Sequence, residues 1–173
     1  VTIKTRRGEH TVEHDEQPLK GRPDKIPSLR PAFTKDGTIT AANSSSISDG
    51  ASALLVASAS AVEAHNLQPM AKIVAHARFS RPPEEFTLAP VGAIEKLLER
   101  TGWKAADVDL WEINEAFAMV TMLAMNAFDL DHERVNVHGG ACAQGHPCGS
   151  TGSRILVTLA RALQHYGKQR GIA

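Results

Sequence analysis

The sequence predicts an α/β domain in which strands and helices alternate along the chain from residue 51 onward. Short apolar segments with a two-residue period are followed there by segments whose apolar residues recur every three to four positions. The 173 residues can bury one core, and a hydrophobic fraction of 42% is usual for a globular chain. We therefore expect a layered α/β domain at residues 51–173, preceded by a different kind of segment at residues 1–50.

Residues 1–50 have the composition of a hairpin followed by loops. Residues 1–14 alternate in polarity around Arg7-Gly8-Glu9, which predicts a short hairpin. Residues 15–50 contain four prolines and then a passage rich in Gly, Ser and Asn that ends at Gly50. Because proline interrupts regular structure, we expect a loop-rich region or a lid over this stretch.

Four strands are expected in the α/β part. The segment at 51–57 is small and apolar, and in the segment at 73–79 the side chains of Ile73, Ala75, Ala77 and Phe79 would share one face. Further strands are expected at Val108–Ile113 and Val135–His138.

Four helices are expected between and after these strands. The first is a short helix at Ser60–His65. Each of the other three has an apolar stripe at helical spacing. The stripes are Val91, Ile94, Leu97 and Leu98, ended by Gly102; Phe117, Val120, Leu123 and Ala127, in a helix beginning near Asn114; and Ile155, Leu159 and Leu163, ended by Gly167.

Composition argues against several classes of protein. Nineteen basic and 19 acidic residues cancel, whereas a nucleic-acid-binding protein usually has a basic excess. No apolar run approaches the roughly 20 residues that span a bilayer, and no signal peptide opens the chain. With two cysteines and no sign of secretion, a structural disulfide is not expected. We expect a cytoplasmic enzyme, and a chain that starts at Val1 and stops at Ala173 looks like a piece of a larger one.

A glycine-rich turn between an expected strand and the last helix is the first candidate site. Its sequence, GGACAQGHPCGSTG at residues 139–152, places His146 directly before Pro147, which favours an extended backbone for the histidine. Backbone N–H groups in such a turn can hold an anion, and an imidazole can move protons near neutral pH. The spacing matches neither a dinucleotide-binding fingerprint nor a P-loop. Residue types alone leave open whether the glycines serve catalysis or only tight packing.

Asn114 and the two cysteines are further candidates with structural alternatives. Asn114 is suited to be a helix N-cap, and Glu115 to interact with the helix dipole in the first turn. Cys142 and Cys148 are within reach of His146 in sequence, so one of them could be a nucleophile, although a small buried hydrophobe is the favoured role for both. Together the three residues lack a fourth zinc ligand, and we expect no metal site.

Three boxes taken together resemble the thiolase family. Asn114–Ala118, NEAFA, is similar to the family's Asn-Glu-Ala-Phe box, and residues 139–152 are similar to its GGxxxxGHPxGxxG signature. Asn43–Gly50, NSSSISDG, resembles the segment before the C-terminal domain. The resemblance covers essentially all 173 residues but only the second half of a thiolase subunit, and it implies the C-terminal βαβαβαββ half, with its last strands missing, after the tail of the loop domain.

The resemblance implies specific roles in the site. His146 would activate the nucleophilic cysteine and, with a water held by Asn114, form the oxyanion hole for the thioester oxygen. Ser45 would bond the pantetheine arm of coenzyme A. The aromatic and small residues expected along the same channel are Phe33, Ala116 and Phe117, with Phe86 in the wall of the acyl pocket.

The resemblance also implies that this chain holds only part of the site. The family's nucleophilic cysteine lies in the N-terminal half, and its acid/base cysteine lies in a Cys-x-Gly segment beyond Ala173. Cys142 and Cys148 occupy positions that are usually aliphatic in the family, so neither is assigned these roles. We expect the 173-residue chain to be inactive alone and to need the other thiolase half as a partner.

The expected reaction is the condensation of two acetyl-CoA to acetoacetyl-CoA and its reverse. Coenzyme A thioesters would be the substrates, no further cofactor is expected, and thiolases of this kind are homodimers or homotetramers. Phe86-Thr87-Leu88-Ala89-Pro90 and Lys25-Ile26-Pro27 look closer to the mitochondrial acetoacetyl-CoA type. The alternatives are a degradative 3-ketoacyl-CoA thiolase for longer chains and a non-catalytic CoA-binding or assembly fragment. Ketoacyl synthases are disfavoured because their His-Gly-Thr-Gly-Thr box is missing.

Overall fold

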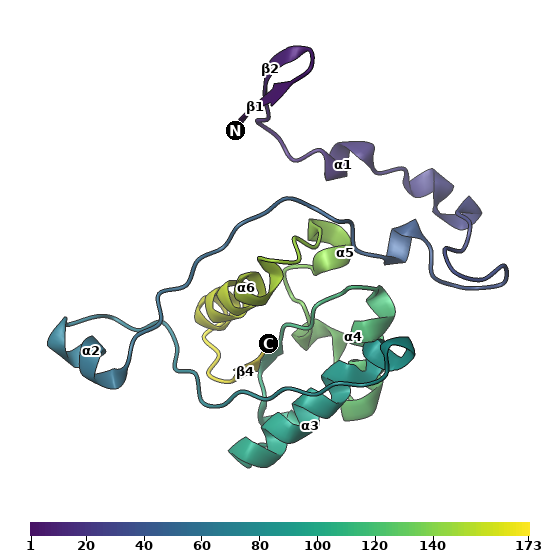
Figure 1. Ribbon diagram of the computed structural model, residues 1–173. Coiled ribbons are helices and arrows are strands. Elements are labelled where there is room, and N and C mark those ends of the chain that lie inside the picture. The colour runs from purple at the N-terminus through teal and green to yellow at the C-terminus, as the bar shows by residue number, and fades with distance from the viewer.

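A computed structural model describes residues 1–173 (Figure 1). The α-helices are α1 Gln17–Lys20, α2 Ala59–Ala64, α3 Ala89–Thr101, α4 Ala118–Phe128, α5 Ala141–Gln144 and α6 Thr151–His165. The strands are β1 Thr2–Thr5, β2 Gly8–Thr11, β3 Leu110–Trp111 and β4 Gly171–Ile172. Short 3-10 helices occur at η1 Pro23–Ser28, η2 Ala41–Asn43, η3 Pro83–Leu88, η4 Ala105–Asp107 and η5 His132–Arg134.

The first 50 residues form the predicted hairpin and loops. β1 and β2 pair antiparallel from Thr2 opposite Thr11 to Thr5 opposite Gly8, and Gly8 has the positive φ of 112° that its turn requires. Beyond the hairpin, only short helical segments interrupt the loops up to Gly50. Figure 1 shows the hairpin apart from the group of α3, α4, α5 and α6. The hairpin and the loop-rich segment are thus confirmed.

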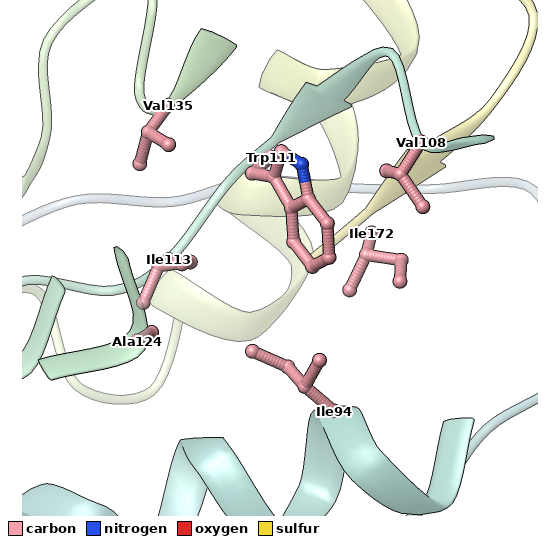
Figure 2. Close-up of a cluster of buried hydrophobic side chains, with 7 residues drawn as sticks. All are labelled: Ile94, Val108, Trp111, Ile113, Ala124, Val135 and Ile172. Carbon is pink, nitrogen blue, oxygen red and sulfur yellow. The ribbon is translucent and has the colours of Figure 1, made fainter. Parts of the chain in front are cut away.

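The core lies between α3, α4 and the strand pair β3–β4. Trp111, on β3, is only 1% exposed and stacks against Phe128 of α4, with ring centroids 6.4 Å apart. Figure 2 shows Ile94 of α3 pointing toward Trp111, with Ile172 of β4 on the same side. The largest cluster of buried side chains consists of Ile94, Val108, Trp111, Ile113, Ala124, Val135 and Ile172. Helix and strand surfaces therefore share one core, as an α/β layer arrangement requires.

β3 and β4 form a short parallel pair that helix α6 covers. Leu110 lies opposite Gly171 and Trp111 opposite Ile172. Leu159 of α6 packs against Leu110 in a second, smaller cluster. The Asp109 carboxylate accepts hydrogen bonds from the backbone N–H groups of Gln169 and Arg170, which lowers its pKa and anchors the start of β4. The pattern at 108–113 predicted β3, but no pattern predicted β4.

Three of the expected strands do not form as expected. No backbone–backbone hydrogen bond involves residues 51–57 or 73–79, so these segments run without a ladder partner. Residues 135–138 make a single bridge, from Val135 to Trp111, and then turn at Asn136, whose φ is 48°. The reason is that a strand exists only where a neighbouring strand satisfies its N–H and C=O groups, and side-chain periodicity does not supply that neighbour.

The helices follow the sequence pattern more closely, because their hydrogen bonds are internal. α2 and α3 form where expected, and α3 ends at Gly102, which adopts the left-handed conformation with a φ of 69°. α6 ends at His165, two residues before Gly167, whose φ is 62°. α4 begins at Ala118 rather than near Asn114, and Phe117 precedes it as N-cap. None of the helices has the length and apolar character needed to cross a membrane.

Candidate active site

Asn114 lies in the extended segment that leaves β3, not at the cap of a helix. Phe117 occupies the N-cap position of α4, so the N-cap alternative for Asn114 is wrong. The segment is fixed one residue earlier, where the Asn136 side chain accepts from the N–H of Ile113 at 2.8 Å and donates to its C=O at 2.9 Å. This side chain does what a neighbouring strand would do for Ile113. It thereby holds Asn114 at a rigid exit from the sheet.

The Asn114 side chain faces the imidazole of His146. Its Nδ2 donates to His146 Nε2 at 3.4 Å, while its Oδ1 is buried and has no hydrogen-bond partner. A buried unpaired carbonyl oxygen is costly, because it has lost its water and gained no other donor. The Oδ1 atom is therefore suited to accept a hydrogen bond from a bound water or a ligand.

The glycine-rich turn fixes His146 through both its backbone and its ring. The N–H of His146 donates to the C=O of Ser46 at 2.8 Å. Nδ1 of the ring lies 2.7 Å from the Thr151 hydroxyl, which itself donates to the C=O of Pro147 at 3.1 Å. The Thr151 hydroxyl donates to Pro147 and the Asn114 amide group can only donate to Nε2, so this arrangement favours the tautomer with the proton on Nδ1 and the lone pair on Nε2. Nε2 is thus placed to accept a proton beside Asn114.

Thr151 is a site residue that the sequence analysis missed. It lies five residues after His146 at the start of α6 and is 4% exposed. The available signal was its place in the same glycine-rich box, at the first turn of the predicted last helix. Only the folded turn shows that its hydroxyl reaches the imidazole rather than the helix N-terminus.

Ser45 joins the two corners from the loop-rich segment. Its backbone N–H and its hydroxyl both donate to the C=O of Ala116, at 3.1 and 3.0 Å. Isolated bridges pair Ser44 with Phe117 and Ile47 with His146. A Cβ atom at position 145 would overlap with the hydroxyl of Ser48, so only glycine fits there. The φ of 86° at Gly145 also favours glycine. The three boxes predicted from sequence therefore meet in space.

The predicted channel residues divide into two groups. Phe33 and Phe117 pack edge to face with ring centroids 5.6 Å apart, and the ring centroid of Phe86 lies 6.1 Å from that of Phe117. Phe86, Asn114 and Ala116 line a mainly apolar cavity of about 310 Å³ bounded by α3 and the end of β4, and Ser45, Phe33, Phe117 and His146 do not line it. Phe33 itself is largely exposed.

A buried ion pair lies behind Asn114. Glu112, which is 2% exposed, has its Oε2 3.6 Å from Nη1 of Arg154 on α6. Burial raises the pKa of Glu112 to about 7, and the attraction of Arg154 offsets only part of that effect. The pair links the strand that leads to Asn114 with the helix that carries Thr151.

Neither cysteine has the character of a nucleophile. Burial, the negative charge of Glu115 and a hydrogen bond to it raise the pKa of the Cys142 thiol to about 11, so the reactive thiolate is disfavoured. Cys148 is exposed, so its predicted role as a buried hydrophobe is wrong. The imidazole of His146 bonds Asn114 and Thr151, and neither sulfur. The structure contains no cluster of three or more His, Cys, Asp or Glu side chains that could hold a metal ion.

Comparison with known proteins finds one family throughout the chain. The model of the thiolase C-terminal domain matches residues 67–173, and the model of the thiolase N-terminal domain matches residues 1–60. A probable acetyl-CoA acetyltransferase of Dictyostelium discoideum is 47% identical over the whole chain, and the acetyl-CoA acetyltransferase of Escherichia coli is 43% identical. The chain spans 42% and 44% of the length of these two relatives.

Solved structures give the same picture. The acetyl-CoA acetyltransferase of Bacillus anthracis superimposes with a TM-score of 0.88 at 41% identity, over 98% of this chain and 43% of its own. Human mitochondrial 3-ketoacyl-CoA thiolase superimposes with a TM-score of 0.82 at 38% identity, over 97% of this chain and 43% of its own. These matches confirm the α/β thiolase fold, and with the family-model matches they establish that the chain belongs to the thiolase family.

Proposed function

We propose that this chain supplies the histidine and asparagine half of a thiolase active site, in an enzyme that condenses two acetyl-CoA to acetoacetyl-CoA and catalyses the reverse thiolysis. The observation that carries the proposal is the pair of Asn114 Nδ2 and His146 Nε2 at 3.4 Å, with Nδ1 fixed by Thr151. The relatives named as acetyl-CoA acetyltransferases support the choice of substrate.

The first half-reaction needs a base for a thiol. His146 Nε2 accepts the proton of a cysteine thiol, and the thiolate attacks the carbonyl carbon of acetyl-CoA. The tetrahedral intermediate collapses to an acetyl-cysteine, and the departing CoA sulfur takes the proton back from Nε2. The neutral imidazole with its proton on Nδ1 is the form that can begin this cycle.

The second half-reaction needs stabilisation of an enolate. A second acetyl-CoA loses an α-proton to a base, and its carbon attacks the acetyl-cysteine, so that a C–C bond forms and the cysteine sulfur leaves. The negative charge on the thioester oxygen would be met by a water held on the unpaired Oδ1 of Asn114, and by His146 when its Nε2 also carries a proton, in the imidazolium form.

The nucleophilic cysteine would come from the other half of the thiolase fold. Cys142 and Cys148 are the two cysteines of this sequence, and neither contacts the imidazole of His146. The segments at 51–57 and 73–79 expose Leu55, Val56 and Ile73 and have no backbone partners. Exposed apolar segments with free N–H and C=O groups are suited to dock against such a partner.

The main test replaces His146 by alanine in the enzyme assembled with its other half. We expect the rate of acetoacetyl-CoA thiolysis to fall by a factor of about 10² to 10⁴, because the variant loses a general base. The melting temperature should be nearly unchanged, because the variant loses little packing. His132→Ala, at an exposed histidine in η5, is the matched control and should keep full activity. Near-normal activity of the His146 variant would remove the residue from the mechanism.

Asn114→Ala tests the oxyanion role separately. We expect a loss of turnover of about 10² to 10³, the value of one oxyanion donor, with little change in the KM for acetoacetyl-CoA. Because Asn114 caps no helix, the melting temperature of the Asn114→Ala variant should stay close to that of the parent protein. A large fall in melting temperature with intact turnover per folded molecule would return Asn114 to a structural role.

Two alternatives are tested by changing the substrate or the protein. A degradative 3-ketoacyl-CoA thiolase is supported by the likeness to the human mitochondrial enzyme of that name, and higher rates on a long-chain 3-ketoacyl-CoA than on acetoacetyl-CoA would favour it. A non-catalytic CoA-binding fragment would bind coenzyme A and never turn over, even with the other half present. Thiolysis by the 173-residue chain alone would contradict the proposal that the nucleophile lies elsewhere.

The homo-oligomeric state, cytoplasmic location and lack of a further cofactor stay predictions.

A further inference from the structure

Glu115 lies beside the catalytic candidates, but its carboxylate serves another part of the chain. Oε1 accepts from Nδ2 of Asn136 at 2.8 Å, and Oε2 accepts from the backbone N–H of Cys142 at 3.0 Å. Cys142 is in the first turn of α5, where N–H groups have no partner inside the helix. The expectation that Glu115 acts in the first turn of α4 is wrong, because α4 begins three residues later at Ala118.

Gly140 shows that the carboxylate is closely enclosed. Its φ of −119° is open to any residue, so backbone conformation does not require glycine there. A Cβ on Gly140 would instead overlap with the carboxylate carbon and both carboxylate oxygens of Glu115. The turn is therefore shaped to let this carboxylate approach the N-terminus of α5.

The carboxylate connects the two ends of the Asn114–His146 pair. On one side, Glu115 follows Asn114 directly, and Asn136 bonds both Glu115 and the backbone of Ile113. On the other side, α5 ends at Gln144, and after Gly145 the chain reaches His146. A displacement of α5 would therefore change the 3.4 Å separation between Asn114 Nδ2 and His146 Nε2.

We propose that Glu115 is a positioning residue that, by fixing the N-terminus of α5, sets the spacing between Asn114 and His146. That spacing keeps the hydrogen bond from Asn114 Nδ2 to Nε2, which together with Thr151 holds the ring proton on Nδ1. The two donors that meet the carboxylate come from different segments, so a group with two acceptors is required. Glutamine has the same shape but only one acceptor oxygen. Its NH₂ group would face either the Asn136 NH₂ or the Cys142 N–H, and because both of these are donors, one of the two hydrogen bonds would be lost. The effect on catalysis rests on the proposed function, whereas the geometry does not.

The test compares Glu115→Gln with Glu133→Gln in the 173-residue chain. Glu133 is an exposed acid in η5 and is the matched control. The readout is the pair of ¹⁵N imidazole chemical shifts of His146, which distinguish a proton on Nδ1 from one on Nε2. We expect a single Nδ1–H form in the parent and in the Glu133 variant, and a mixture of both tautomers in Glu115→Gln, with retained far-UV circular dichroism.

Two further variants keep the proposal testable if Glu115→Gln does not fold. Glu115→Asp keeps the charge but is shorter by one carbon, so it should retain at most one bond and give an intermediate tautomer mixture. Cys142→Ala keeps the backbone N–H and removes only the thiol, so His146 should behave as in the parent. Unchanged His146 signals in a folded Glu115→Gln or Glu115→Asp chain would overturn the proposal.

Activity then separates this inference from the proposed function. With the other thiolase half present, Glu115→Gln should lower the kcat for acetoacetyl-CoA thiolysis by about tenfold or more and leave its KM unchanged. A shift of the His146 tautomer in a protein without any thiolase activity would support the positioning role while refuting the proposed reaction. An altered KM with a normal tautomer would overturn the positioning role and leave the reaction standing.

Discussion

The two parts of this chain differ in how they are held. All 19 buried residues lie between Gly92 and Ile172, whereas the first 91 residues contribute none. In the second part, helices and strands pack on Trp111 and its neighbours (Figure 2). In the first part, Figure 1 shows long segments that loop away from the group of α3, α4, α5 and α6. Ser45, in one of these segments, bonds the C=O of Ala116. The comparison indicates that the second part carries the stability, and the first part contributes a segment to the site.

The largest expected effect is in the core of the second part. Trp111→Ala should lower the free energy of unfolding by about 3–5 kcal/mol, since it removes a side chain that is 1% exposed and stacks on Phe128. Leu55→Ala, at a side chain that is 87% exposed, should change it by less than about 0.5 kcal/mol. Urea unfolding of both variants measures the difference, and equal losses would show that the first part is as tightly packed as the second.

A smaller effect is expected from the buried carboxyl of Glu112. Its pKa is about 7 in the folded protein and 4.5 in the unfolded chain, so the folded state binds more protons between these values. Stability from this group is therefore complete below about pH 4.5 and falls as the pH rises to about 7, by up to about 3 kcal/mol. Glu112→Gln should remove this fall. Melting curves from pH 4.5 to 8 measure it, and an identical slope in the variant would place the ionisation elsewhere.

The smallest effect tests the attachment between the two parts. Ser45→Ala removes one hydrogen bond to the C=O of Ala116, worth about 1 kcal/mol, and keeps the bond from its backbone N–H. Local opening should become about fivefold more frequent, so trypsin should cleave after Lys20 and Lys25 correspondingly faster. Thr5→Ala, which removes an exposed bond to the C=O of Gly8 in the hairpin, is the control. Cleavage unaffected by Ser45→Ala would mean that other contacts hold the segment.

Elements with internal hydrogen bonds were predictable, and elements that need a partner were less so. The helical stripe ending at Gly102 predicted α3 closely, because a helix satisfies its own backbone. The alternation at 73–79 is still visible, since Ala75, Ala77 and Phe79 are half-buried and Val74 is exposed. No strand forms there, because no neighbouring strand completes the ladder. β4 was missed because two residues carry no periodicity.

The amino-acid sequence alone was enough to predict which chemical groups this chain offers. His146 before Pro147, Asn114 after a strand, and Ser45 in a third box are enough to identify the family and to propose a proton acceptor with an amide neighbour. Only the fold shows how these groups are arranged. It directed the hydroxyl of Thr151 to Nδ1, left Oδ1 of Asn114 without a partner, and turned Glu115 toward α5 instead of α4. Hydrogen bonds between distant residues depend on the position of whole segments, and local sequence patterns do not encode those positions.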